Sequence, residues 1–338
     1  MKKIFYLIFY FPQIIFAQWH DANWHFGGLP YFNGSPPLKN AIANTLGNSP
    51  TFEVTGTYLQ NFQNSVTMSD KDGNLLFYCN GMKIYNKAHQ MMENGAGVNA
   101  GATASDPYYI EYGYPIYYTM VCLPIGNERY FLFHSRKIDG CSSFAGADIL
   151  YTVIDMSANN GLGRVLDKNK EIIGCEIGAW CAMSATRHAN GQDWWVIVAN
   201  HDNNRYFRIR LTPEGIAETS IISIDSELGN WGNGRSIFTP DGSKYIDCRN
   251  ARSARVYEFD RCEGNFGQYQ DIPTSADIPY GLGIGATTSA NSRYLYLCSG
   301  LALTQVDLYA SDIASTLDTI ALHDDFFDES IYFISFIV

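Results

Sequence analysis

The segment RHANGQDWW (187–195) holds the densest group of side chains that could take part in chemistry. It begins with Arg187 and His188 and ends with Trp194 and Trp195. An imidazole titrates near neutral pH, which suits acid–base work, and paired indoles could stack on sugar rings. Arg187, Trp194 and Trp195 are therefore candidate ligand-binding residues, and His188 is a candidate catalytic residue. The alternative is that HANGQD forms a β-turn and the two tryptophans point to opposite faces of the next strand.

Asp106 and Asp241 are the carboxylates that could join His188 in a polysaccharide hydrolase or lyase. Hydrolysis of a glycosidic bond needs two such groups about 5–9.5 Å apart, so these residues would have to meet in the folded chain. The sequence has no HExxH zinc pair, no GxSxG nucleophile elbow and no P-loop. A catalytic interpretation therefore depends on these three side chains alone.

The phrase SDKDGN places oxygen-bearing side chains at every second position, Asp70, Asp72 and Asn74. Such ligands suit a hard cation, so these residues are a candidate calcium site, and no other cofactor is expected. The phrase lacks the distal bidentate Glu of a complete calcium-binding loop. The alternative is a plain hairpin turn, for which Asp, Asn and Gly are the usual residues.

The chain has eight cysteines, which could form disulfides in an exported protein. Cys175 and Cys181 frame GCEIGAWC, and Cys248 and Cys262 are expected on the two neighbouring strands of one repeat, so these are the two predicted pairs. The alternative is that cysteines serve as small apolar packing residues. Three copies of the repeat have a cysteine at the same point, and these copies lie too far apart for their cysteines to bond. These three are Cys79, Cys248 and Cys298.

A repeat supplies the elements that must position these residues. A phrase consisting of a turn, an apolar strand, a polar break and an aromatic-rich strand occurs five times, at about 50–60 residues per copy. The copies are DGNLLFYCNGMKIYN (72–86), NERYFLFHSRK with ILYTVIDM (127–156), GQDWWVIVANHDNNRYFRIRL (191–211), PDGSKYIDCRNARSARVYEFD (240–260) and NSRYLYLCSGLALTQVDLY (291–309). This pattern predicts an all-β fold, a β-propeller of four-stranded blades. Five blades are visible, and we expect a seven-bladed type that is incomplete in this chain.

Stretches of small residues precede several copies and predict the innermost strand of a blade, where large side chains would collide near the ring axis. They are ATASD (102–106), CAMSATRHAN (181–190), GRSIFTPDG (234–242) and GLGIGATTSAN (281–291). The tyrosine-rich DPYYIEYGYPIYY (106–118) either packs between blades or exposes an aromatic face to glycans or peptides.

The N-terminus has the layout of a secretory signal peptide over residues 1–17, where Lys2 and Lys3 precede an apolar run. The run is shorter than the roughly 20 residues that span a bilayer, so no transmembrane anchor is expected. We expect a secreted or cell-surface protein. Its predicted parts are the signal peptide, a turn-rich lead-in segment at 18–60 and the propeller at 61–338.

The chain is acidic, with a net charge of −11 and a pI near 5.0. This charge argues against nucleic acid and anionic membrane surfaces as partners. With 46% apolar and 14% aromatic residues, the sequence has ample material for a packed core.

Several phrases carry a family resemblance. They are SDKDGNLLFYCNGMKIYNKAHQMMENG (69–95), LYTVIDMSANNGLGRVLDKNKEII (150–173), ATRHANGQDWWVIV (185–198), FTPDGSKY (238–245) and YEFDRCEGNFG (257–267). They resemble secreted proteins of Bacteroidetes that have an N-terminal propeller, often followed by PKD-type domains and a sorting signal for type IX secretion. The resemblance implies a propeller and export, and implies no defined enzymatic activity. Such relatives continue with another blade, so we expect a C-terminally truncated copy.

Two function classes follow. The first is a secreted binding or scaffold propeller that presents its loops to a protein or glycan partner at the cell surface, which is an argument from fold. The alternative is a propeller hydrolase or lyase acting on polysaccharide, with His188 and a carboxylate at the mouth of the ring.

Overall fold

The computed structural model describes residues 20, 22–26, 41–47, 49–55, 65–112, 114, 119–126, 128–138, 146–177, 182–200, 205–224, 235–250, 253–274, 285–299 and 302–322. Its strands are β1 (Asn23–Phe26), β2 (Ala41–Asn44), β3 (Thr51–Val54), β4 (Val66–Ser69), β5 (Leu75–Cys79), β6 (Lys83–Asn86), β7 (Met91–Ala96), β8 (Met120–Ile125), β9 (Arg129–Lys137), β10 (Ala147–Asp155), β11 (Arg164–Ile177), β12 (Ala182–Arg187), β13 (Trp194–Ala199), β14 (Arg205–Thr212), β15 (Gly215–Ser223), β16 (Ser236–Phe238), β17 (Lys244–Asn250), β18 (Ser253–Asp260), β19 (Asn265–Pro273), β20 (Gly285–Thr288), β21 (Tyr294–Ser299), β22 (Ala302–Asp307) and β23 (Asp318–Leu322). The helices are α1 (Ala102–Ser105) and α2 (Pro107–Tyr112), with 3-10 turns at Asn159–Gly161 and Ala314–Thr316.

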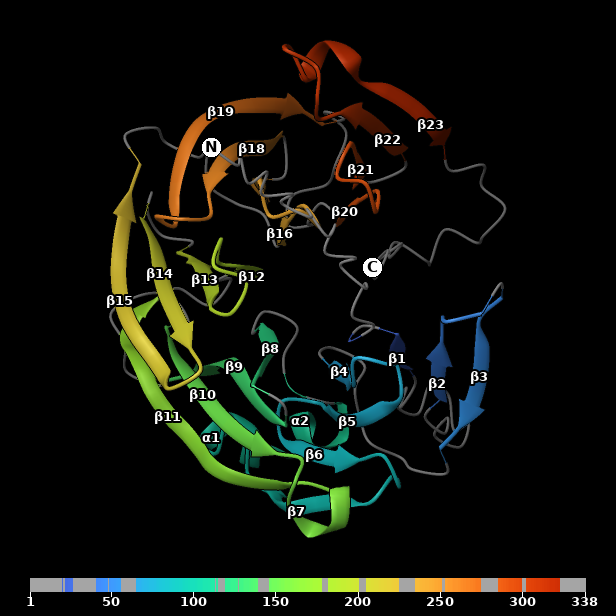
Figure 1. Cartoon of the computed structure of the whole chain (residues 1–338), viewed down its shortest axis with the longest axis vertical. Coiled ribbons are helices and arrows are strands. Elements are labelled where there is room, and N and C mark those ends of the chain that lie inside the picture. The colour runs from blue at the N-terminus through green and yellow to red at the C-terminus, as the bar shows by residue number, and fades with distance from the viewer. Residues whose placement is uncertain are drawn as a thin grey trace, which may run out of the picture.

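Five successive groups of four antiparallel strands lie around a common centre, which confirms the predicted propeller (Figure 1). We call them the first blade (β4–β7), second blade (β8–β11), third blade (β12–β15), fourth blade (β16–β19) and fifth blade (β20–β23). In each blade the strands follow one another from the first, innermost strand to the fourth, outermost one. The five sequence copies supply the second and third strands of these blades.

The second and third strands are apolar because neighbouring blades cover both of their faces. In β13, WWVIVA, five of the six residues are buried, whereas β23 is exposed throughout. When both faces of a strand are buried, residues pointing to either face are apolar, so the sequence of the strand is a continuous apolar run. The outermost strands face solvent and carry more polar residues.

The buried apolar residues gather between consecutive blades. Phe133 and Ile149 of the second blade pack with Val196 and Ile209 of the third. Similar clusters join the first blade to the second, the third to the fourth and the fourth to the fifth. The fold is thus stabilised mainly by burial between sheets, since each sheet must cover its neighbour.

The lead-in segment contributes a separate three-stranded sheet, formed by β1, β2 and β3. Asn23 ties it to the first blade by donating from Nδ2 to Ser69 Oγ at 3.0 Å and to the Gly73 carbonyl at 2.8 Å. The His25 ring stacks on Tyr78 with centroids 4.2 Å apart. A segment expected to be turn-rich therefore also holds strands, because short four-residue strands leave little periodic signal.

The outer edges of the first and second blades are joined. Arg164 of β11 pairs in parallel with Glu93 of β7, which merges the two blades into one eight-stranded sheet. Asn94 Nδ2 also donates to the Val165 carbonyl at 3.0 Å. The Lys168 ammonium donates to the carbonyls of Asn94 and Ala96, so this contact is held by side chains as well as backbone.

The prediction for ATASD was wrong. These residues form α1 instead of an innermost strand, and the second blade starts with β8. The tyrosine-rich segment continues into α2, where Tyr108 is 52% exposed. Tyr114 is fully buried against Met82 and Ala147, so it packs between the first two blades. The other three small-residue stretches do contain innermost strands, β12, β16 and β20.

A buried polar network lies where the first two blades meet. The ring of His134 is fully buried, with Nδ1 2.6 Å from Asn99 Oδ1 and Nε2 2.9 Å from Thr152 Oγ1. Because Asn99 Oδ1 can only accept, Nδ1 carries the proton and Nε2 accepts from the hydroxyl, which is the neutral imidazole. Burial, followed by the charge of Arg136, lowers the pKa of His134 from 6.5 to about 3.

Acidification should destabilise the protein through this histidine. The folded state keeps His134 neutral, so its contribution is complete above pH 6.5 and is lost as the pH falls toward the lowered pKa. Between pH 7.5 and 5 we expect about 2 kcal/mol less free energy of unfolding from this group. Urea titrations of wild type and His134→Gln at both pH values measure this free energy. It should change less with pH in the variant, and an equal change in both proteins would contradict the neutral state assigned to His134.

Candidate functional site

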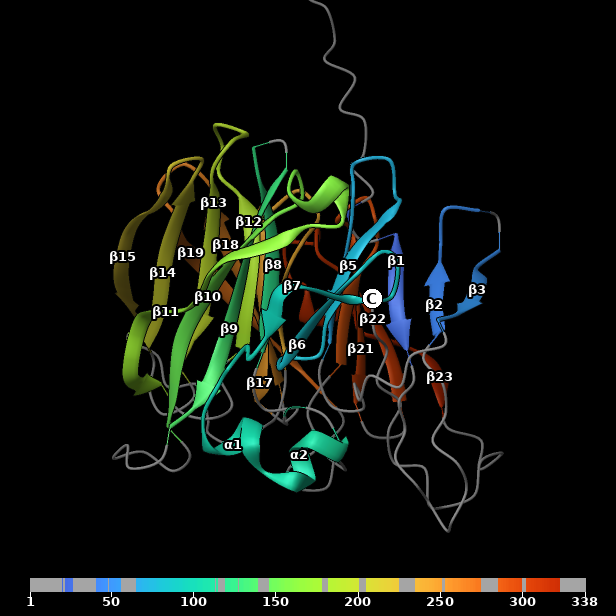
Figure 2. The same ribbon diagram turned by 90° about the horizontal axis from the view of Figure 1, so that it is seen from below.

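The connections from first to second strand and from third to fourth strand lie at one edge of every blade, which we call the turn face. Figure 2 shows these hairpins along the upper edge of the sheets, with α1 and α2 along the lower edge. His188 and Asp241 lie on the turn face, in the third and fourth blades. Asp106 ends α1 and therefore lies at the opposite edge. The three candidate catalytic residues are not brought together.

His188 takes part in a β-turn. Its Nδ1 accepts from the Asn190 backbone at 3.0 Å, and its carbonyl accepts from the Gly191 backbone at 2.9 Å. Asn190 Oδ1 in turn accepts from the backbones of Gln192 and Asp193, both at 3.0 Å. The polar groups of HANGQD are thus used to close the turn between β12 and β13.

The two tryptophans point to opposite faces of β13 and join the third blade to both neighbours. Trp194 Nε1 donates to the Pro124 carbonyl of the second blade at 3.0 Å. Trp195 Nε1 donates to the Arg261 carbonyl of the fourth blade at 2.9 Å, and this side chain is 2% exposed. Arg187 lies 3.9 Å above the Trp194 ring and donates to the Gln192 carbonyl. Neither face of Trp195 is open to a ligand.

Asp241 is also part of a turn. Its Oδ1 accepts from Thr239 Oγ1 at 2.7 Å and from the backbone of Ser243 at 3.0 Å. Burial alone would raise the pKa of Asp241, but the hydrogen bonds from Thr239, Ser243 and Ser292 outweigh it and hold the pKa below its ordinary value. This carboxylate therefore stays ionised near neutral pH and is a poor proton donor.

The candidate calcium ligands also form a hairpin turn. Asp70 Oδ1 accepts from the backbones of Asp72 and Asn74, at 2.8 and 2.9 Å, while its Oδ2 accepts from Asn74 Nδ2. Lys71 pairs with Asp72 at 2.7 Å. No group of three or more His, Cys, Asp or Glu side chains suited to a metal occurs in the part of the chain that the structure describes.

Cys248 and Cys262 are free thiols, so their predicted disulfide was wrong. Cys248 lies buried on β17, whereas Cys262 is exposed in the turn after β18. Asp247 pairs with Arg255, so Cys248 lies far along the strands from the turn that holds Cys262. Cys79 is likewise a free, buried thiol, and Cys298 is buried too, as packing residues should be. The predicted Cys175 and Cys181 pair lies outside the described side chains.

Three blades have an ion pair on the turn face. It joins a residue at the start of the second strand to a residue of opposite charge near the end of the third strand. The pairs are Asp193 with Arg210 at 2.8 Å in the third blade, Lys244 with Glu258 in the fourth and Arg293 with Asp307 at 2.8 Å in the fifth. In the third and fourth blades the partner lies two residues before the end of the third strand, whereas Asp307 of the fifth blade is equivalent to Asp155 of the second. Arg129 and Asp155 are backbone partners in register and form no close ion pair, although the charge of Arg129 helps to lower the pKa of Asp155.

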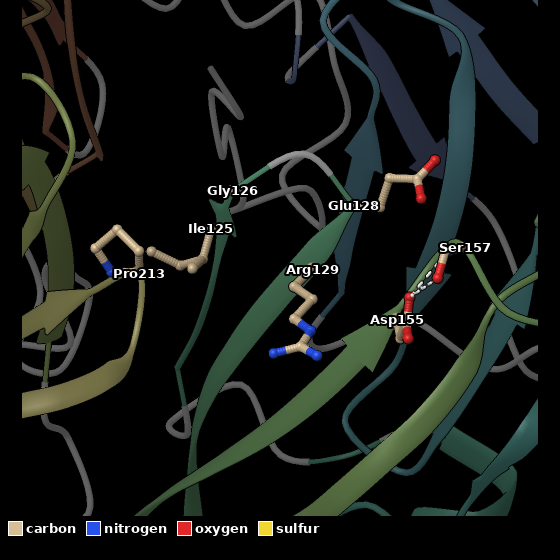
Figure 3. A pocket seen from close by; sticks show the side chains of 7 residues that line it. All are labelled: Ile125, Gly126, Glu128, Arg129, Asp155, Ser157 and Pro213. Atoms are coloured by element: carbon tan, nitrogen blue, oxygen red, sulfur yellow. Dashed lines mark hydrogen bonds between the residues drawn. The ribbon is translucent and has the colours of Figure 1, made fainter.

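The Asp155 carboxylate is held by Ser157 instead. Its Oδ1 accepts from the Ser157 backbone at 2.9 Å and from the Ser157 hydroxyl at 2.6 Å. The serine hydroxyl, partly opposed by burial, lowers the pKa of Asp155, so it is ionised at neutral pH. The guanidinium of Arg129 is exposed and makes no hydrogen bond or close ion pair among the described residues (Figure 3).

A pocket of about 330 Å³ opens beside Arg129, between the second and third blades (Figure 3). Its lining is Ile125, Gly126, Glu128, Arg129, Asp155, Ser157 and Pro213. The pocket exists because two short connections meet here. The β8–β9 connection covers only 126–128 and the β14–β15 connection only 213–214, whereas the equivalent connections of the neighbouring interface cover 188–193 and 261–264.

The neighbouring interface shows what fills this space elsewhere. Arg261 is the residue after the third strand of the fourth blade, and it donates to the carbonyls of Arg187 and Asp241 at 2.9 and 3.0 Å. Pro213 occupies the same place in the third blade and has no side-chain donor. In the sequence, the pocket is indicated only by a proline and a short turn at positions where other repeats have a longer connection. Neither is a reactive side chain, so neither pointed to a site.

No protein-family model matches the chain, and no curated protein matches it. Solved structures resemble it in fold only. A protein of unknown function from Desulfotomaculum acetoxidans is 12% identical over 84% of this chain and 82% of its own, with a TM-score of 0.46. The Dos1 propeller is 10% identical over 85% of this chain and 68% of its own, with a TM-score of 0.40. An oligogalacturonate lyase in complex with manganese is 10% identical over 85% of this chain and 71% of its own, with a TM-score of 0.41.

Gly264 tests the packing of the fourth blade on Trp195. A Cβ at this glycine would lie 2.8 Å from the Trp195 ring, and its φ is +68°. Gly191 has a similar φ of +72° but open space around it, so it is the matched control. We expect Gly191→Ala to cost about 1 kcal/mol from backbone strain and Gly264→Ala about 2 kcal/mol more from the clash. Urea unfolding measures both, and equal losses would contradict this packing.

Alkylation tests the cysteine assignment. Without denaturant, iodoacetamide should modify exposed Cys262 and spare Cys248, because burial raises the pKa of the Cys248 thiol and blocks access. Both should react after unfolding without reductant. Mass spectrometry of the peptides gives the result. A linked peptide containing Cys248 and Cys262 in the unreduced digest would show that the thiols are not free.

Proposed function

We propose that this chain is an exported binding or scaffold propeller that engages a protein or glycan partner at the cell surface through its turn face. The observation that carries this proposal is the pocket beside Arg129. Among the described residues the repeat departs here from the fifth blade and from the neighbouring interface, since Arg129 forms no close ion pair and Pro213 stands in place of Arg261.

A guanidinium at a pocket mouth that no described residue holds in a hydrogen bond or close ion pair supports recognition. Arg129 has five N–H donors, and the other basic residues at this position are occupied by carboxylates. Pockets that bind small groups combine a few convergent polar groups with an apolar wall, and Pro213 supplies such a wall here. The pocket lies on the edge of the ring where hairpins from several blades are presented together.

Export is part of the proposal and is supported by the basic residues and short apolar run of 1–17. No helix of the described residues is long and apolar enough to cross a membrane. The hydrolase or lyase alternative lacks a comparable observation, because His188 and Asp241 serve turns in separate blades and Asp106 lies at the other edge.

Filling the pocket should abolish binding. Pro213→Arg places a long side chain where Arg261 stands in the next blade, and Glu214→Arg places the same side chain one residue farther along the turn, outside the pocket lining. The labelled protein would be incubated with cell-envelope material of the producing organism and sedimented. We expect wild type and Glu214→Arg to be retained and Pro213→Arg to lose at least tenfold in affinity, with unchanged melting temperatures. Equal retention of all three would refute the proposal.

A further inference from the structure

The charges around the pocket restrict what it can bind. Asp155 and Glu128 oppose the single positive charge of Arg129, so the lining is slightly negative. A carboxylate or phosphate ligand that paired with Arg129 would face the ionised Asp155, and a cationic ligand would face the guanidinium. Like charges within a few ångströms are unfavourable, so a neutral polar group is the best match.

The hydrogen-bonding groups make the match more specific. Arg129 offers donors that are not used by described residues, and Asp155 keeps Oδ2 as an acceptor because its Oδ1 is held by Ser157. A donor and an acceptor on adjacent strands complement a pair of neighbouring hydroxyls, since each hydroxyl can both accept and donate. Hydrogen bonds to charged groups are also stronger than those between neutral groups.

The remaining lining suits the C–H face of a sugar ring. Pro213 is exposed and presents its apolar ring, and the lining also includes Ile125, which is 3% exposed. The pocket volume of about 330 Å³ is at the lower end of the range for ligand sites, which fits one ring. On the basis of the proposed function, we propose that the pocket between the second and third blades binds one neutral sugar unit of a glycan. Arg129 and Asp155 bind its adjacent hydroxyls and Pro213 packs on its C–H face.

The variants follow from the repeat itself. Arg129→Gln removes the charge at the pocket, and Arg293→Gln makes the same change at the equivalent position of the fifth blade, where the arginine is paired with Asp307. Asp155→Asn should keep the turn, because Asn86 accepts backbone hydrogen bonds at the equivalent position of the first blade. Melting temperatures establish that each variant is folded.

The test is calorimetric titration of the purified chain with neutral oligosaccharides (cello-, malto-, xylo- and manno-series) and with oligogalacturonate as the acidic counterpart. We expect wild type to bind at least one neutral series and to bind oligogalacturonate more weakly. Arg129→Gln and Asp155→Asn should each weaken neutral binding about tenfold or more, and Arg293→Gln should leave it unchanged.

Three outcomes would overturn the sugar assignment. Stronger binding of oligogalacturonate, enhanced by Asp155→Asn, would identify an acidic ligand. Unchanged affinity in Arg129→Gln would place the sugar elsewhere. Absence of any carbohydrate binding, while Pro213→Arg still abolishes envelope retention, would indicate a protein partner and leave the proposed function intact. If wild type neither binds a sugar nor is retained by the envelope, both proposals fail.

Discussion

The structure depends on burial between neighbouring sheets. Each blade has two apolar faces and cannot cover either face by itself, so the four clusters that join consecutive blades supply the core. This constraint explains the continuous apolar runs of the second and third strands and the exposure of the outermost ones. It also explains why bulky side chains such as Trp194 and Trp195 lie at blade interfaces, each donating its indole N–H to a different neighbour.

Polar side chains on the turn face mainly hold the hairpins and lock adjacent blades together. Asp70, Asn190 and Asp241 each accept backbone hydrogen bonds within their own turn. Arg261 bridges the third and fourth blades through backbone carbonyls. Residue types that could perform catalysis are therefore used in structure, because exposed hairpins need acceptors for their unpaired N–H groups.

In such a repeat, departures from the pattern are more informative than reactive side chains. Two shortened connections and Pro213 leave a pocket where the next interface is filled, and Arg129 beside it forms no close ion pair with the residues that the structure describes. The same comparison supplies matched controls, since Arg293 and Asn86 occupy equivalent positions with structural contacts. Features that all blades share serve folding, whereas the differences between blades leave room for a binding site.

The sequence by itself determined the repeat, the β class and the order of the strands, because turn residues and apolar runs are local and recur in every blade. It could not show that His188 and Asp106 lie at opposite edges, nor that Cys262 falls in a turn away from Cys248, since these depend on how far each strand extends. It also missed α1 and the sheet of β1–β3, whose segments are too short to show a period. Only the tertiary structure revealed the pocket, because the space beside Arg129 is set by two connections from different blades that are distant in sequence.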